Sequence, residues 1–447
     1  MKIKPKLSFW QIWNMSFGFF GIQFGWGLQM ANMSAIYTYL GANAGDIALL
    51  WLAAPVTGVL IQPLIGQASD RTWTRLGRRR PFILGGAILA SIALILMPNS
   101  PSIWMAAGLL WVLDGTINAS MQPFRAMVAD NMPEEQGSQG FAIQSLFIGL
   151  GGTIASALPW MMTNWFAIPS EGAGEGHIPL SVTLSFYIGA VAFLGAVLWT
   201  VFTTKEIPPE EPEIAAIRSR KFDWTFGLKE IFSLFGHLPR KMWELGLVQF
   251  FTWIGMFCLW VYFSPSIASG VFHAKPGSVE MEDSGAWAGF CFAMYNAVCF
   301  LFSFVLLRVT RWTSPKIIHS LCLFIGAVGL LTIPVMNEKY ALLFSMTAIG
   351  IAWASILSMP YAILTPALPK DKVGVMMGLF NLFIVFPQIA ASGFLGKIIE
   401  MFFDNNPMSA MFIGGISMAI ASVTTVFVVR GSRKSSGKTL VNTSPGH

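Results

Sequence analysis

The chain has 447 residues, of which 54% are apolar, 14% aromatic and only 11% charged, and its formal net charge is +6. Soluble domains carry roughly 25% charged residues, so this composition excludes an ordinary soluble protein and indicates a polytopic membrane protein embedded in a lipid bilayer. The modest positive charge gives no reason to expect a nucleic-acid partner.

Twelve apolar segments are each long enough to cross a bilayer, which takes about 20 helical residues. They cover residues 10–38, 47–68, 81–98, 102–129, 139–166, 179–203, 242–269, 285–307, 315–336, 340–366, 373–402 and 408–430. The long connections are the charged, proline-rich stretch 204–241 and the polar tail 431–447. We therefore expect an all-α fold of twelve transmembrane helices in two pseudo-symmetric six-helix bundles.

The expected domains follow from these connections. The first bundle covers residues 1–203, a cytoplasmic linker 204–241, the second bundle 242–430, and a cytoplasmic tail 431–447. The linker segment IRSRKFDWTFGLKEIFSLF has the pattern of an amphipathic helix that lies on the membrane surface.

The distribution of basic residues predicts the orientation of the spans. If the N-terminus is cytoplasmic, 24 of the 28 lysines and arginines fall in cytoplasmic segments, and only Lys275, Lys339 and Lys397 fall in outer loops. By the positive-inside rule, both termini are then cytoplasmic. We expect a plasma membrane, and a bacterial inner membrane is the favoured case.

The sequence offers little support for catalysis. The five histidines lie in loops or near helix ends, and no phosphate-binding GxxxxGK[ST] loop occurs. The four cysteines (Cys258, Cys291, Cys299 and Cys322) lie in apolar segments without metal-ligand spacing. We therefore expect no enzyme activity, no metal and no cofactor.

A weak internal repeat supports two related halves. MQPFRAMVADNMPEEQGSQG in the fourth span and MPYAILTPALPKDKVGVMMG in the tenth share a proline at a helix end, a second proline about ten residues later and a glycine before the next helix. Such placement is expected for parallel six-helix repeats. When Pro123 is aligned with Pro360, apolar residues stand opposite Asp114 and Arg125, so this ionisable chemistry belongs to the N-terminal half alone.

Apart from the residues at span ends that are counted with the loops, three charged side chains fall inside the predicted spans: Asp114, Arg125 and Glu244. Glu244 is only a few residues inside its span, and we expect it to pair with Arg240 and Lys241 near the membrane surface. Asp114 lies about twelve residues, or roughly 18 Å, into its span and therefore near the bilayer midplane.

Asp114 shares one helix face with Asn118, Met121, Gln122 and Arg125. A polar stripe within a membrane is expected to face a water-filled cavity, because unsatisfied polar groups are costly in lipid. The favoured interpretation of Asp114 is a carboxyl group that binds and releases one proton as the cavity changes sides; the alternative is a structural hydrogen bond between helices. Arg125 suits either snorkelling to the surface or a substrate or gating contact.

Amides and tryptophans occur at similar depth in other spans. The candidate substrate-binding residues are Gln23, Gln29, Asn32, Asn118, Gln122, Arg125, Gln249, Trp253, Asn296, Trp353, Asn381 and Gln388. Uncharged amides and ring faces suit a neutral polyhydroxylated ligand, whereas an anion would require several buried arginines or lysines. Each amide taken singly is equally well interpreted as an interhelical hydrogen bond, and most aromatic residues are expected to serve packing.

Several motifs together resemble one family. GIQFGWGLQ, WLAAPVTGVLIQPLIGQASDR, LGRRRPFI and LDG followed by PFRAMVAD resemble the plant sucrose–proton symporters and their bacterial and animal relatives. These form part of the glycoside-pentoside-hexuronide branch of the major facilitator superfamily. The resemblance is close over residues 15–160 and looser in the C-terminal half, where LVQFFTWIGMF and MPYAILTPAL are recognisable.

The resemblance implies two six-helix bundles around a central site with alternating access. It also implies that Asp114 is the proton-coupling carboxylate and that Gln23 and Gln29 help to hold a glycoside. Plant sucrose carriers commonly have histidine where this chain has Gln67, and bacterial relatives handle maltose, so maltose and sucrose are both candidates.

The sequence thus predicts a proton-coupled importer of a disaccharide, an α-glucoside such as maltose or sucrose, that functions as a monomer. Sodium coupling is disfavoured because only one carboxylate is deep, while hard cations require several oxygen ligands. The alternatives are a drug or lipophilic-cation exporter, a passive sugar uniporter and a non-transporting sugar sensor.

The loop GQASDRTWTRLGRRRP concentrates five arginines between the second and third spans. Asp70 ends the second span, where the helix dipole disfavours an acid, so it requires a partner. Candidates are Arg71, Arg78 and the start of the eleventh span near Lys372. Because this loop resembles a latch in the superfamily, we expect Asp70, Arg71 and Arg78 to form a cytoplasmic gate.

Overall fold

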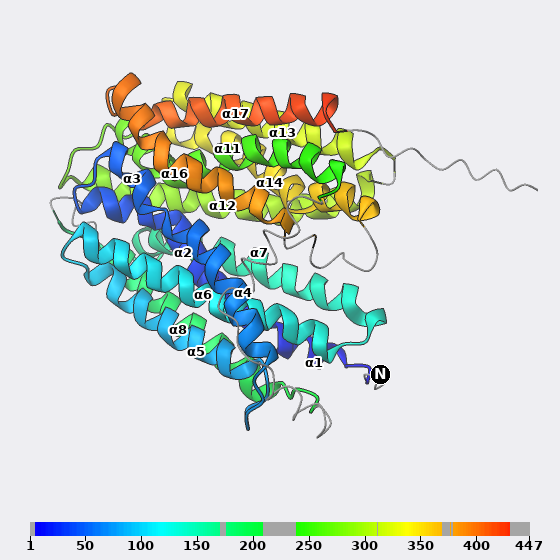
Figure 1. Ribbon diagram of the computed structural model, residues 1–447. Helices are drawn as coiled ribbons and strands as arrows, with labels where there is room; N and C mark the ends of the chain where they lie inside the picture. The colour runs from blue at the N-terminus through cyan, green and yellow to red at the C-terminus, as the bar shows by residue number, and fades with distance from the viewer. Residues whose placement is uncertain are drawn as a thin grey trace, which may run out of the picture.

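The computed structural model describes residues 5–169, 176–208, 238–310, 312–368, 376 and 379–429, and the regular elements among them are helical. Helices are expected here because a chain in lipid must satisfy its backbone hydrogen bonds within each spanning segment. Figure 1 shows the long helices lying side by side in two groups.

The first group contains the helices of the N-terminal half. In chain order they are α1 (Phe9–Ser16), α2 (Gly18–Tyr39), α3 (Ala44–Leu50), α4 (Ala53–Asp70), α5 (Arg80–Leu96), α6 (Ile103–Asn131), α7 (Glu134–Asn164) and α8 (Leu180–Thr203). The first predicted span is divided between α1 and α2, and the second between α3 and α4. Within the group, α2 packs against α7 and α8, α5 against α6 and α8, and α4 against α6.

The second group contains the helices of the C-terminal half. They are α11 (Arg240–Gly270), α12 (Val279–Val309), α13 (Pro315–Thr332), α14 (Leu342–Leu364), α16 (Leu382–Phe402) and α17 (Met408–Phe427). α11 packs against α16 and α17, α13 against α14 and α17, and α12 against α14. Most of the predicted linker, including its amphipathic segment, and the whole predicted tail lie outside the described residues.

Several helices begin where the sequence supplies a cap. Ser8 and Gln11 exchange side-chain-to-backbone hydrogen bonds at the start of α1, which is a capping box. The hydroxyl groups of Ser278 and Ser314 accept backbone N–H groups at the starts of α12 and α13. These local signals agree with the apolar pattern and locate the helix starts.

Within the part of the chain that the structure describes, ten helices are long and apolar enough to cross a membrane, and α2 and α6 are not among them. Both helices are long enough, but polar residues reduce their hydropathy. These residues include Gln23 and Gln29 in α2 and Asp114 and Asn118 in α6. The least apolar helices of the predicted twelve are therefore those that carry the N-terminal candidate site.

One predicted boundary is wrong in a way that affects the charge distribution. α12 begins at Val279 rather than at residue 285, so its first turn includes Glu282. The sequence assigned Glu282 to an outer loop, yet it is 1% exposed and accepts a 2.8 Å hydrogen bond from the Ser181 hydroxyl of α8. Hydropathy excluded this turn because of its acids, although acids are favourable at a helix N-terminus.

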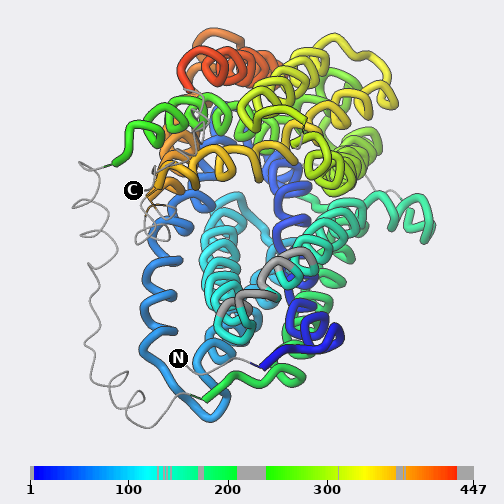
Figure 2. The backbone as a smooth tube through the Cα atoms, turned by 90° about the vertical axis from the view of Figure 1, so that its right-hand side faces the viewer, coloured from blue at the N-terminus to red at the C-terminus, as the bar shows by residue number. Residues whose placement is uncertain are grey.

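The two groups meet where α2 contacts α11 and α12, where α7 contacts α12, and where α16 contacts α3 and α4. Figure 2 shows the same division from the side. Tyr262 of α11 donates a 2.9 Å hydrogen bond to the Ala44 carbonyl, and a Cβ at Gly396 would overlap the Gly45 carbonyl. These contacts close one end of the interface, which we call the sealed end.

Candidate functional site

Asp114 lies fully buried on α6 and contacts α2 of the same bundle. The Gln29 amide nitrogen donates a 2.7 Å hydrogen bond to Asp114 Oδ1. Asp114 Oδ2 and Gln29 Oε1 are buried and have no hydrogen-bond partner. The carboxyl group is thus held by one oxygen, and its other oxygen is left to bind a proton or ligand.

A chain of amides continues from Asp114 to α4. The Asn118 amide nitrogen donates to the Asp114 carbonyl at 2.9 Å and contacts the Thr57 hydroxyl at 3.4 Å, while the Asn118 oxygen accepts from Gln62 at 2.8 Å. Sequence reasoning predicted Asn118 but missed Gln62. The available signal was a polar residue directly before Pro63, a helix-interior proline, within an apolar span.

The predicted stripe extends along α6 through Pro123, which the helix accommodates without ending. Met121 is buried, Gln122 is half-buried, and Arg125 is exposed. The role of Arg125 in substrate binding or gating stays a prediction.

Aromatic rings gather on the C-terminal side of the site. Trp253 and Trp260 of α11 and Trp353 of α14 contact one another, with ring centroids 5.3–5.8 Å apart. Tyr295 of α12 stacks on Trp353 at 6.0 Å. We call these four residues the ring cluster. The structure therefore brings together two of the candidate substrate-binding residues, Trp253 and Trp353, with Trp260 and Tyr295; their substrate contacts stay predictions.

Gln249 lies one turn before Trp253 on α11 and is 1% exposed. Neither its amide nitrogen nor its amide oxygen has a hydrogen-bond partner, and Trp253 Nε1 has none either. A buried unpaired polar group costs about 1–3 kcal/mol, so three such atoms on one helix face require a compensating role.

The other predicted site amides are less distinctive. Asn32, Asn296 and Gln388 each donate to the carbonyl four residues earlier in their own helix, at 2.8–3.0 Å. Gln23 is half-buried on α2, and Asn381 is the residue before α16. In Asn32, Asn296 and Gln388 the amide nitrogen is used in the bond within the helix, and the bond does not involve the amide oxygen. The substrate contacts of all these residues stay predictions.

The loop after α4 gives Asp70 two arginine partners. Asp70 Oδ1 lies 2.6 Å from Arg78 Nη2 and 2.6 Å from Arg79 Nη2. Arg79 also binds Asp130 of α6 at 2.9 Å and the Ser69 hydroxyl at 2.6 Å. The sequence predicted Arg78 but not Arg79; the role of Arg71 stays a prediction, and Lys372 lies outside the described residues.

Glu206, which follows α8, binds the backbone of this loop. This role was not predicted from the sequence. The Glu206 carboxylate accepts the backbone N–H groups of Arg78, Arg79 and Arg80 at 2.8–2.9 Å. These N–H groups lie at the start of α5, where the helix dipole attracts an anion. Gly77, with φ +110°, makes the turn that presents them.

Glu244 forms the expected ion pairs with Arg240 and Lys241, although its side chain is only 9% exposed. Its oxygens lie 3.5 Å from Arg240 Nε and 3.4 Å from Lys241 Nζ. Among the described residues, no group of three or more His, Cys, Asp or Glu side chains could hold a metal ion. All four cysteines are free and buried.

Comparison with known sequences identifies related transport proteins. The sequence profile of the Major Facilitator Superfamily matches residues 15–392. Sucrose transport protein SUC4 of Arabidopsis thaliana is 27% identical over 453 residues, which cover 90% of this chain and 88% of that protein. Sucrose transport protein SUT2 of Oryza sativa subsp. indica is 28% identical and covers 89% of each chain.

Solved structures share the fold at low sequence identity. The nucleoside transporter NupG aligns with a TM-score of 0.69 at 14% identity, over 95% of this chain and 99% of that one. A POT family transporter in complex with 5-aminolevulinic acid aligns with a TM-score of 0.69 at 15% identity, over 95% and 98%. The predicted arrangement of two helical bundles is thereby confirmed.

Proposed function

Because this chain belongs to the Major Facilitator Superfamily, we propose that it is a proton-coupled symporter that imports a disaccharide by alternating access. The proposed substrate is an α-glucoside such as maltose or sucrose. We further propose that bundles at residues 1–203 and 242–430 move against each other as a monomer in the plasma membrane, with both termini cytoplasmic.

The observation that carries the proposal is the Asp114–Gln29 pair. Asp114 is fully buried on α6, and only one of its oxygens is hydrogen-bonded. A proton on Asp114 Oδ2 would convert that atom from an acceptor into a donor, so protonation changes what the site can bind. This is the behaviour required of a coupling carboxylate.

The chemistry of the surrounding residues supports a neutral sugar. Around Asp114 lie the amides of Gln29, Asn118 and Gln62, which supply both donors and acceptors. Hydroxyl groups require both kinds of partner, whereas an anionic substrate would require paired cations. The names of the plant relatives support the same substrate class.

The closed interface fits one stage of the proposed cycle. If the termini are cytoplasmic, the sealed end is extracellular, because Tyr39 and the chain around Ala44 lie at the far ends of their helices from the termini. Proton and sugar would then leave towards the cytoplasm. One coupled charge gains about 2.3 kcal/mol per 100 mV of membrane potential, which is sufficient to concentrate a sugar several tens of times.

Three rival activities are separated by their ligands and energetics. An exporter of lipophilic cations would bind tetraphenylphosphonium rather than sugars. A passive uniporter would equilibrate sugar without accumulation, and a sensor would bind sugar without flux. Sodium coupling would respond to a sodium gradient at constant pH.

The test is uptake of radiolabelled maltose and sucrose into proteoliposomes under an imposed inward proton gradient. We expect accumulation above the external concentration, which a protonophore abolishes and a sodium gradient does not replace. Empty liposomes control for leakage. Equilibration without accumulation would favour the uniporter, and binding of tetraphenylphosphonium without sugar uptake would favour the exporter.

A further inference from the structure

A row of aromatic rings crosses from one helix group to the other at the sealed end. Neighbouring members are in contact, with ring centroids 4.5–5.8 Å apart. We call it the aromatic row, and it consists, in order, of Trp165, Trp160, Phe290, Trp287 and Tyr340. The first two lie at the end of α7, the next two on α12, and the last in the short 3₁₀ turn Lys339–Ala341 before α14. A Cβ at Gly285, near the start of α12, would overlap the Tyr39 hydroxyl at the end of α2, which locates the row at the sealed end.

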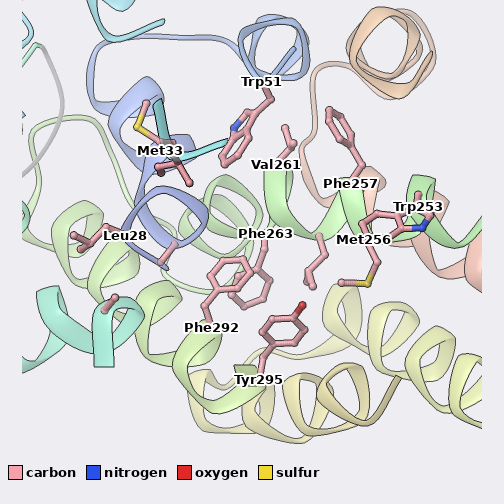
Figure 3. Packing of buried hydrophobic residues seen from close by; sticks show 14 of the residues in the cluster. Leu28, Met33, Trp51, Trp253, Met256, Phe257, Val261, Phe263, Phe292 and Tyr295 are labelled. Carbon is pink, nitrogen blue, oxygen red and sulfur yellow. The ribbon is translucent and has the colours of Figure 1, made fainter. Parts of the chain in front are cut away.

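The row passes between the groups where α7 packs against α12. The ring centroids of Trp160 and Phe290 are 4.5 Å apart. Figure 3 shows Phe292 of α12 beside Phe263 of α11 among the buried side chains, and these two ring centroids are 5.5 Å apart. Because residues two apart on a helix point about 200° apart, Phe290 is directed away from this buried layer and towards the edge of the interface.

Lys339 is held at one end of the row by two rings. Its Nζ lies 5.4 Å from the ring centroid of Trp287 and 5.3 Å from that of Tyr340, and Trp287 Nε1 donates a 3.0 Å hydrogen bond to the Lys339 carbonyl. Aromatic faces attract an ammonium group but carry no net charge. In the part of the chain that the structure describes, no carboxylate forms an ion pair with Lys339. Its positive charge is therefore available to an external anion.

The rings at both ends of the row are exposed. Trp165 is 66% exposed and Tyr340 63%, and they lie at the ends of two helices that are apolar enough to cross a membrane. Tryptophan and tyrosine favour this level, where an apolar ring meets the lipid headgroups. Phe344, four residues after Tyr340 on α14, is 78% exposed and extends the apolar surface along the helix. A small soluble anion would use the lysine but gain nothing from these rings.

We propose that Lys339 and the aromatic row form a binding site for the headgroup phosphate of an acidic phospholipid at the sealed end. The ammonium group pairs with the phosphate, Tyr340 and Trp165 lie at the headgroup level, and the acyl chains cover Phe344. This site goes beyond the proposed function, because it does not depend on which solute the protein carries or on how transport is driven.

An acidic phospholipid fits the site better than a zwitterionic one. The phosphate of phosphatidylglycerol has no cation beside it, whereas the choline of phosphatidylcholine competes with Lys339 both for the phosphate and for the ring faces. One lysine close to an anionic lipid surface contributes a preference of about fivefold in affinity. The charge of Lys339 therefore sets the size of the expected lipid preference.

The experiment measures binding of single lipids to the full chain in detergent by native mass spectrometry. The probes are dioleoyl phosphatidylglycerol, dioleoyl phosphatidylcholine and inorganic phosphate. We expect the dissociation constant for the first phosphatidylglycerol to be at least fivefold lower than that for phosphatidylcholine, and an excess of inorganic phosphate not to displace the lipid. Equal affinities for the two lipids would overturn the proposal, and displacement by inorganic phosphate would show a site for small anions instead.

Substitutions at Lys339 test its part in the site. We expect Lys339→Gln to raise the dissociation constant for phosphatidylglycerol about fivefold, to the level of phosphatidylcholine. Lys339→Arg should stay within twofold of wild type, because a guanidinium group also lies favourably over ring faces. Matched controls are Lys397→Gln, at an exposed lysine beside Gly396 at the same end, and Trp104→Leu, at a ring that is 80% exposed at the start of α6.

The outcomes separate a defined site from general surface charge. If Lys339→Gln protein keeps the wild-type affinity for phosphatidylglycerol, the site assignment is wrong. If Lys397→Gln weakens binding as much as Lys339→Gln does, the preference belongs to the whole surface and the site is excluded. Size-exclusion profiles identify variants that fail to fold. In that case wild-type protein carries the test, because its preference for phosphatidylglycerol should shrink as salt screens the Lys339 charge, and a salt-independent preference would contradict the pairing.

Discussion

The Gln29 amide nitrogen holds Asp114 Oδ1 at 2.7 Å, while Asp114 Oδ2 has no partner although it is buried. The two oxygens of one carboxyl group therefore have different tasks. One oxygen fixes the orientation of the side chain between α2 and α6. The other is available to a proton, and this arrangement makes Asp114 testable separately from the rest of the site.

Asp114→Asn should abolish proton-driven accumulation without abolishing sugar binding. The asparagine keeps an oxygen that can accept from Gln29, so the packing of α2 on α6 is retained, but it cannot bind and release a proton. We expect the accumulation ratio to fall to about one while exchange of labelled for unlabelled sugar continues. Accumulation by Asp114→Asn protein to the wild-type ratio would exclude Asp114 as the coupling group.

Glu206→Gln should destabilise the loop between α4 and α5. The neutral amide replaces a carboxylate that binds three backbone N–H groups, and its nitrogen would face those donors. Loss of charge-assisted bonds at this largely buried site is expected to cost about 2 kcal/mol. Thermal unfolding in detergent should show a lower Tm, with Glu338→Gln, at an exposed glutamate, as the control. Equal Tm values in both variants would contradict this role.

Gly396→Ala should prevent closure of the sealed end. A Cβ at this position overlaps the Gly45 carbonyl, whereas a Cβ at Gly393 meets no neighbouring atom. We expect Gly396→Ala to slow uptake at least tenfold and to increase labelling of a cysteine introduced at Ser284 in a cysteine-free background. Gly393→Ala is the control, and unchanged labelling in Gly396→Ala protein would show that the close approach is dispensable.

Arg79→Lys should loosen the contact between α4 and α6. Arg79 binds Asp70 and Asp130 together through a planar guanidinium group, which a single ammonium group does not reproduce. Because both aspartates are nearly half exposed, we expect a loss of only about 1 kcal/mol. Hydrogen exchange of the backbone between Ser69 and Arg80 should accelerate, and the exposed Arg75→Lys variant should leave it unchanged.

The sequence predicted the parts of the site that depend on a single helix. Asp114 and Asn118 are four residues apart, so helical geometry sufficed to put them on one face, and the structure joins them by a hydrogen bond. Gln249 and Trp253, which are also four residues apart, share a face of α11 for the same reason. Their lack of partners was not visible in the sequence, because pairing depends on the neighbouring helices.

The sequence did not predict contacts in which the partner is a backbone group, or contacts for which several similar residues are possible partners. Glu206 binds N–H groups, which no residue pattern records. Asp70 could have met any of five loop arginines, and the turn at Gly77 selects Arg78 and Arg79. Glu282 was misplaced because hydropathy treats an acid as a loop signal even where Ser181 satisfies it.

The polarity of α2 and α6 has a consequence for biogenesis. Among the described residues, neither helix is one of those apolar enough to cross a membrane by composition, because α2 carries Gln23 and Gln29 and α6 carries Asp114 and Asn118. We expect both to leave the translocon only together with apolar neighbours, α8 for α2 and α5 for α6, against which they pack in the finished bundle. The polar residues of the candidate site would thus also influence the order in which the nascent chain enters the membrane.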